Sequence, residues 1–75
     1  MGSMSDIQSI HHDGHLVALV AGGEAMIAPS VPDAELLTVQ AMCLYAIDVV
    51  AGRLPGPYND VEALRYARAA AAQRN

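Results

Sequence analysis

The residues best suited to chemistry in this sequence are three histidines that lie close together near the N-terminus. His11, His12 and His15 surround the dipeptide Asp13-Gly14. Imidazole nitrogens and carboxylate oxygens are ligands that Zn²⁺ and related ions prefer in proteins. A tight turn at Asp13-Gly14 places His12 and His15 side by side and directs His11 to the opposite face. The sequence therefore offers His12, His15 and Asp13 as candidate metal ligands.

This set falls short of the four protein ligands that a structural zinc site needs, and the sequence contains no second ligand pair. A polar, solvated turn is the simpler interpretation, so we expect the protein to need no cofactor. The alternative is a metal-binding protein that uses the His11–His15 cluster, with the ion shared between two copies of the chain.

The rest of the sequence shows no catalytic pattern. No spacing is typical of a serine, histidine and acid triad, although such triads are assembled in space. The segment Gly22-Gly23-Glu24 lacks the Lys and the Ser or Thr of a phosphate-binding loop, and we interpret it as a turn. Cys43 lies in an apolar run and is expected to act as a small hydrophobic residue. Asp48 is expected to be exposed or hydrogen-bonded. We predict that the protein is not an enzyme.

Length and charge limit the remaining classes. The chain has 75 residues, and we expect an expression-tag remnant at 1–3 and one small domain at 4–75. The net charge is −4, and residues 1–52 carry six acidic residues and no Lys or Arg. Nucleic acid is therefore an unlikely partner, and only the C-terminal segment offers a basic surface. The longest apolar run, 36–51, is short for a bilayer span, and we expect a cytoplasmic protein with no membrane partner.

The elements that position the histidines are predicted to be three strands. Asp13-Gly14 is a strong hairpin signal, because a type I′ turn needs positive φ at both central residues. A second turn at Gly22-Gly23 extends the hairpin to an antiparallel β-meander with strands at about 7–12, 15–21 and 24–28. In the expected register, His12 pairs with His15, Ile10 with Val17 and Gln8 with Leu19.

The central strand of this meander is apolar on both faces, whereas a strand with one solvated face would alternate. One face is expected to pack against the helices of the chain, and it consists of Ile10, Val17, Leu19 and Met26. The other face then needs a different cover, and it consists of Ile7, Leu16, Ala18, Val20 and Ile27.

Two helices are predicted to follow, at about 31–51 and 60–73. Ser30 is a plausible N-cap of the first helix, and Gly52 is a typical residue to end it. Asn59 and Glu62 have the spacing of a capping box at the start of the second. The first helix is apolar around most of its circumference, which indicates burial on more than one side. The fold class is therefore α+β: a three-stranded meander followed by two α-helices, expected to be dimeric.

This excess of apolar surface leads to the functional prediction. We expect a small non-catalytic interaction module, a homo-oligomeric regulator, adaptor or subunit that binds a second copy of itself. A second protein is a further candidate partner. The predicted interface is either the second sheet face or the outer side of the first helix, and its residues are Leu16, Ala18, Val20, Ile27, Met42, Tyr45 and Val49. Further candidate contacts to a partner are Tyr58, Arg65 and Arg68. A nucleic-acid-binding regulator that uses the second helix is a further alternative.

Overall fold

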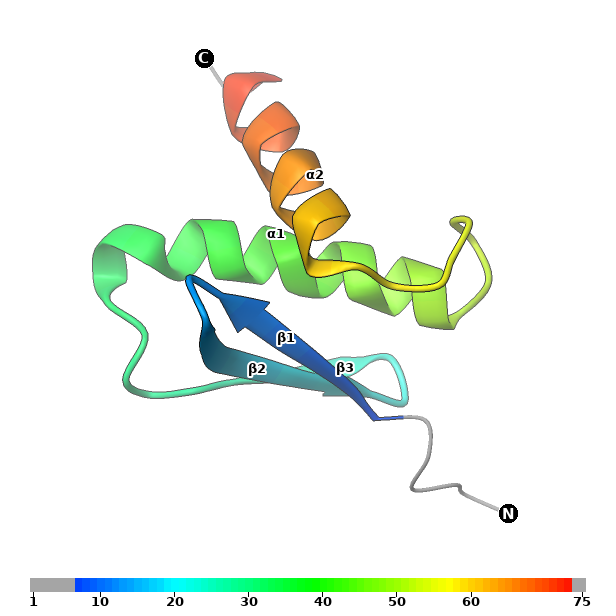
Figure 1. Cartoon of the computed structure of the whole chain (residues 1–75), viewed down its shortest axis with the longest axis horizontal. Coiled ribbons are helices and arrows are strands. Elements are labelled where there is room, and N and C mark those ends of the chain that lie inside the picture. The colour runs from blue at the N-terminus through cyan, green and yellow to red at the C-terminus, as the bar shows by residue number, and fades with distance from the viewer. Residues whose placement is uncertain (1–6, 74–75) are drawn as a thin grey trace.

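The computed structural model describes residues 7–73, so the predicted tag remnant at 1–3 lies outside the described residues. Three strands precede two helices, in the order β1 (Gln8–His12), β2 (His15–Ala21), β3 (Glu24–Ile27), α1 (Asp33–Val50) and α2 (Asp60–Gln73). The strands form one antiparallel sheet in the order β1-β2-β3. Both helices lie on the same side of this sheet, and α2 crosses α1 and extends away from the sheet (Figure 1). The predicted α+β meander with two helices is confirmed.

The turn at Asp13-Gly14 has the predicted backbone conformation, and the predicted turn at Gly22-Gly23 shares it. Asp13 and Gly14 have φ angles of 54° and 79°, and Gly22 and Gly23 have φ angles of 59° and 80°. Positive φ at both central residues defines a type I′ turn, whose twist matches that of the flanking strands. His12 pairs directly with His15, as the sequence predicts.

Beyond this pair, a β-bulge shifts the register of β1 against β2. Leu16 pairs with His11 and Ala18 pairs with Ile10, so Val17 is left without a partner on β1. The expected pairs of Ile10 with Val17 and of Gln8 with Leu19 are therefore wrong. An extra residue in one strand moves every later pair by one position.

The bulge also exchanges the expected faces of β2 and β3 beyond it, whereas Ile10 and Val17 are buried as predicted. Val17 and Ala18 are both buried under α1 although they are neighbours in sequence, and Val20 is completely buried as well. Met26, which was expected to face the helices, is 69% exposed, and its cross-strand partner Leu19 is only half-buried. A one-residue slip exchanges the two faces of a strand because side chains alternate along it.

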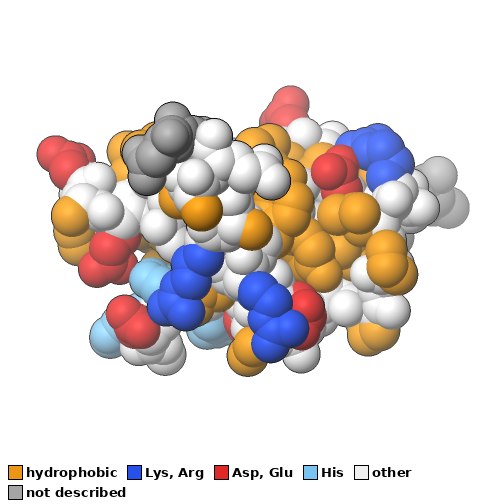
Figure 2. All heavy atoms as spheres, turned by 90° about the horizontal axis from the view of Figure 1, so that it is seen from above, with side chains coloured by type: hydrophobic (Ala, Val, Ile, Leu, Met, Phe, Trp, Pro, Cys, Tyr) orange, Lys and Arg blue, Asp and Glu red, His pale blue; other side chains and the backbone are white. Residues whose placement is uncertain are grey.

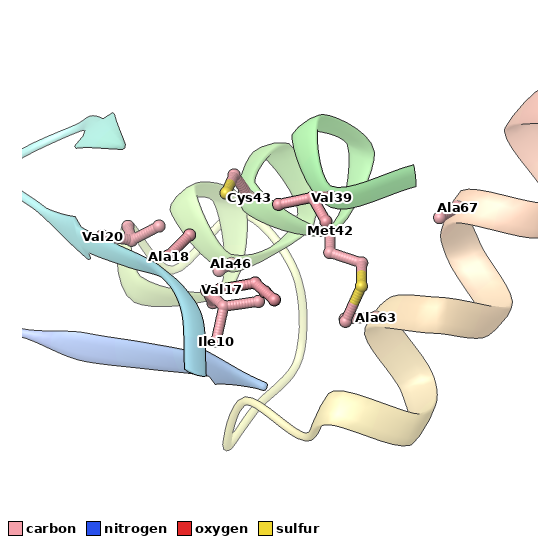
Figure 3. Packing of buried hydrophobic residues seen from close by; sticks show 10 residues of the cluster. All are labelled: Ile10, Val17, Ala18, Val20, Val39, Met42, Cys43, Ala46, Ala63 and Ala67. Atoms are coloured by element: carbon pink, nitrogen blue, oxygen red, sulfur yellow. The ribbon is translucent and has the colours of Figure 1, made fainter. Parts of the chain in front are cut away.

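The core lies between the sheet and α1 and extends to α2. Its largest completely buried side chains are Ile10 of β1, Val20 of β2, and Val39 and Met42 of α1. Met42 points from α1 toward Ala63 of α2 (Figure 3). The buried residues of α2 are alanines, Ala63 and Ala67, so this helix packs closely but buries few atoms.

The helix ends agree only in part with the sequence prediction. α1 begins at Asp33 with Pro32 as its N-cap and no side-chain hydrogen bond, so the expected Ser30 cap is wrong. At the other end, the N–H of Gly52 donates to the carbonyl of Val49 and the N–H of Arg53 to that of Asp48. This is a Schellman motif, with Gly52 at a φ of 83° as the predicted stop.

Of the predicted capping box at the start of α2, the structure shows the Asn59 cap, and the Glu62 carboxylate faces Arg65. The side-chain oxygen of Asn59 accepts hydrogen bonds from the N–H groups of Val61 at 2.8 Å and Glu62 at 3.2 Å. These bonds satisfy donors that have no partner inside the helix. Among the described residues, no helix combines the length and the apolar character that crossing a bilayer requires.

Candidate functional site

The tip of the β1–β2 hairpin meets the first turn of α1, and this contact assembles a cluster of three metal-ligand side chains. The Nε2 atom of His12 lies 3.5 Å from a carboxylate oxygen of Glu35 and 3.7 Å from one of Asp13. One donor atom from each residue lies within 4.8 Å of the other two. We call His12, Asp13 and Glu35 the acid–histidine cluster. The Asp13-Gly14 turn presents Asp13 here, and the helix start at Asp33 presents Glu35.

The cluster borders a pocket of about 560 Å³ between the hairpin tip and the segment that leads into α1. The His12 side chain is only 12% exposed, whereas those of Asp13 and Glu35 are 78% and 42% exposed. His15 lines the same pocket but is not one of the three clustered residues. The structure therefore brings together two of the predicted ligands, His12 and Asp13, and adds Glu35 in place of His15.

A second polar contact joins β1 to the start of α2. One carboxylate oxygen of Asp60 accepts a hydrogen bond from the backbone N–H of His11 at 3.0 Å and another from the hydroxyl of Tyr58 at 2.8 Å. The other oxygen lies 3.8 Å from Nδ1 of the His11 ring. Burial of Tyr58 and its hydrogen bond to Asp60 raise the pKa of its hydroxyl well above the ordinary value. This contact fixes α2 against the edge of the sheet.

Three tyrosines gather where the two helices cross. The ring of Tyr45 lies 5.4 Å from that of Tyr66 and 6.1 Å from that of Tyr58, both in tilted arrangements. Tyr66 is 40% exposed, and Tyr45 and Tyr58 are half-buried. Tilted aromatic pairs at this spacing stabilise packing. The predicted interface residue Tyr45 and the predicted contact Tyr58 thus hold the helices of the chain together.

The side of the sheet turned away from the helices carries exposed apolar side chains. Leu16 is 52% exposed and Met26 is 69% exposed, with the half-buried Leu19 beside them. We call Leu16, Leu19 and Met26 the open sheet face. These side chains border a recess of about 250 Å³, and its other lining residues are also uncharged: Ala18, Ile27, Ala28 and Pro29.

The structure divides the predicted interface residues between the core and the surface. Ala18, Val20 and Met42 are at most 3% exposed within the chain, so their side chains cannot reach a partner. The bulge explains the first two, because it turns them toward α1. Leu16 stays exposed, whereas Ile27 and Val49 are half-buried. Sequence reasoning missed Leu19 and Met26, which it assigned to the covered face.

The other charged and reactive side chains that the sequence singled out lie in ordinary environments. Asp48 binds Arg53, whose nitrogens lie 2.7 and 2.8 Å from one carboxylate oxygen. Arg65, a predicted partner contact, lies 3.5 Å from Glu62 on the same helix, and Arg68 is exposed. Cys43 is free and buried, and burial raises the pKa of its thiol, which disfavours the reactive thiolate.

Comparison of the chain with models of protein families, with curated proteins and with solved structures finds no match to any of them.

Proposed function

We propose that this protein is a non-catalytic interaction module that pairs with a second copy of itself through the open sheet face. One observation carries the proposal. The sheet has helices on one side only (Figure 1). The other side presents Leu16, Leu19 and Met26 around an uncharged recess.

The hydrophobic effect gives the driving force for this pairing. Apolar surface removed from water contributes about 25 cal/mol per Å², and burial of one Leu or Met side chain contributes about 1.5 to 3 kcal/mol. A sheet with one solvated face normally places polar residues there. Here the central strand presents leucines on that face, so covering it stabilises the folded chain.

A second copy is the occupant that the charge pattern favours. In a two-fold pair the same patch lies on both sides of the contact, so any charge on it enters the interface twice and an uncharged patch suits self-pairing. The open sheet face and its recess consist of uncharged residues. Two such sheets can pack face to face about 10 Å apart, with the helices on the outside of the pair.

The helical side of the molecule is a poorer candidate for self-pairing. Leu37 and Leu44 of α1 are exposed there at 61% and 58%. Acidic and basic side chains lie beside the hydrophobic ones in the view of Figure 2. The helices also carry charged pairs, since Asp48 of α1 binds Arg53 and Glu62 of α2 faces Arg65. Pairing through this surface requires these charges to be matched or desolvated, which costs free energy.

Light scattering coupled to size-exclusion chromatography tests the proposal at micromolar concentration. The wild-type protein should elute with twice the 7.9 kDa mass of the chain. Met26→Glu should elute as a monomer, because each copy then places a carboxylate in the apolar contact, and burying an unpaired charge costs free energy. The matched control is Leu44→Glu, which adds the same charge at a position of the helical side that is also more than half exposed, and it should remain dimeric.

Two results would overturn the proposal. One is a monomeric wild-type protein that stays soluble at these concentrations. The other is a dimer that Leu44→Glu dissociates and Met26→Glu does not, because the contact would then lie on the helical side.

In the cell, we propose that the pair acts as a small regulator, adaptor or subunit, which leaves the helical surface free for a second protein. We place it in the cytoplasm, because its single cysteine is unpaired and buried, which suits a reducing compartment. Nucleic acid is a weaker candidate partner. Arg65 already faces Glu62, and the chain carries a net charge of −4.

A further inference from the structure

We propose that the acid–histidine cluster binds one divalent transition-metal ion, with His12, Asp13 and Glu35 as its protein ligands. The site lies at the hairpin tip beside α1, so the inference does not depend on pairing through the open sheet face.

The spacing of the three side chains suits a single ion. Zinc binds imidazole nitrogen and carboxylate oxygen at about 2.0 to 2.2 Å, so two ligand atoms of a tetrahedral ion lie about 3.3 to 3.6 Å apart. The Nε2 atom of His12 lies 3.5 Å from the Glu35 oxygen and 3.7 Å from the Asp13 oxygen. All three donor atoms lie within 4.8 Å of one another, so rotations of the exposed Asp13 and Glu35 side chains can bring them around one ion.

The donor atoms are also available. Among the described residues, no hydrogen bond engages the His12 ring or the carboxylates of Asp13 and Glu35. Two carboxylates that share one imidazole repel each other, and the charge of a divalent cation balances the two negative charges. The mixed nitrogen and oxygen ligands favour Zn²⁺ and its first-row neighbours over Mg²⁺, which prefers oxygen ligands and bound water.

The surroundings resemble an open metal site more than a closed structural one. Three protein ligands leave a fourth position of a tetrahedral ion, and the pocket of about 560 Å³ lies beside the cluster. His15 lines this pocket without joining the cluster. The free position therefore accepts water or a small anionic ligand that enters through the pocket.

Calorimetric titration of Zn²⁺ into the EDTA-treated full chain near neutral pH tests the site, with Mg²⁺ as the comparison ion. We expect one Zn²⁺ per chain and weaker or no Mg²⁺ binding. Glu35→Gln and Asp13→Asn should each weaken Zn²⁺ binding at least about tenfold, since loss of even an outer-shell partner costs that much. Both changes keep the shape of exposed side chains, and Asn tolerates the positive φ of the turn.

The matched control is Asp33→Asn, which removes the same charge from the first turn of α1 at a residue outside the cluster. It should leave Zn²⁺ affinity within about twofold, because a metal ligand loses far more than that. Met26→Glu should also bind Zn²⁺ as the wild type does, whatever its oligomeric state.

Three results would overturn the assignment. The first is a wild-type chain that takes up no Zn²⁺. The second is an Asp33→Asn effect as large as that of Glu35→Gln, which would indicate general charge attraction. The third is binding that His15→Ala abolishes and Glu35→Gln leaves intact.

Discussion

Asp60 joins three separate parts of the chain through one side chain. Its carboxylate accepts hydrogen bonds from the backbone of β1 at His11 and from the hydroxyl of Tyr58, while the residue itself begins α2. Because β1 is an edge strand, its outward N–H at His11 would otherwise need water as a partner. Hydrogen bonds to a charged acceptor contribute more than neutral ones.

We expect Asp60→Ala to lower the free energy of unfolding by about 1 to 3 kcal/mol, since it removes both hydrogen bonds. Urea unfolding followed by circular dichroism measures the change. Asp33→Ala is the matched control, because Asp33 is also the first residue of a helix, and it should cost only the dipole contribution of about 0.3 to 1 kcal/mol. Equal effects of the two substitutions would show that the Asp60 contacts contribute nothing.

The buried hydroxyl of Tyr58 predicts a loss of stability in alkali. Its folded-state pKa is raised above the unfolded value of 10.0, first by burial and then by Asp60. The resulting stabilisation is fully present below pH 10 and decreases as the pH rises above it, because the unfolded chain releases the proton more readily. Tyr58→Phe should therefore lose less stability than the wild type between about pH 8 and about pH 11.

Urea unfolding at the two pH values measures this difference. Cys43 contributes a loss of the same sign, since burial also raises its pKa, and this part should persist in Tyr58→Phe. If Tyr58→Phe loses as much free energy of unfolding between the two pH values as the wild type, Tyr58 does not cause the loss.

The acid–histidine cluster shows how far local sequence predicts a site. His12 and Asp13 were predicted as ligands because the Asp13-Gly14 turn places them by local backbone geometry alone. Glu35 was missed because its approach depends on where α1 begins and how it lies against the hairpin. His15 is paired with His12 as predicted, yet its side chain stays outside the cluster. The local sequence therefore predicts the turn that carries His12 and Asp13, whereas the position of Glu35 depends on tertiary packing.

At the scale of elements, the two ends of α1 differ in how well the local sequence predicts them. The end of α1 was predictable, because Gly52 adopts a φ of 83° that favours glycine. A Cβ atom at this position would meet no atom within 4 Å, so the cost of a side chain lies in the backbone alone. The start of α1 was not predictable to the residue, since Ser30, Val31 and Pro32 are each compatible with a helix N-terminus.

We expect Gly52→Ala to destabilise the protein by about 1 kcal/mol, because alanine is strained in the left-handed region. Gly52→Asn should cost roughly half as much, since Asn tolerates that conformation better. Thermal unfolding of both variants measures the difference. Equal stability of the wild type and Gly52→Ala would mean that the Schellman end does not constrain α1.

The β-bulge is the feature of the sheet that the sequence conceals. The two turns, and the three strands that they join, can be predicted from Asp13-Gly14 and Gly22-Gly23, because the conformation of such turns depends on the local sequence. Beyond the first pair, the register can be predicted only where polar and apolar residues alternate between the two faces of a strand. The run Leu16–Val20 is apolar at every position, so it carries no such alternation. Such a strand fits the core through either face, so packing against α1 decides between them. Packing against α1 buries Ala18 and Val20 and leaves Leu19 on the open sheet face.

At the scale of the whole molecule, burial of one sheet face against α1 gives a small core and leaves the other side of the sheet uncovered. The buried residues of α2 are two alanines, and the largest completely buried side chains come from the sheet and α1: Ile10, Val20, Val39 and Met42. A chain of this length buries a modest fraction of its surface, and small domains are often marginal without a metal ion or a partner. The open sheet face and the acid–histidine cluster are the two places where we propose that this chain gains such stabilisation.

If pairing through the open sheet face supplies part of the stability, the melting temperature must depend on protein concentration. Mass action favours the folded pair as the concentration rises, because the unfolded chains are separate. For a chain of this size, a hundredfold increase in concentration should raise the wild-type Tm by roughly 5 to 10 °C. Calorimetry at the two concentrations measures it, and Leu44→Glu should show the same rise. Met26→Glu should melt at one temperature throughout, and a concentration-independent wild-type Tm would mean that the chain is stable alone.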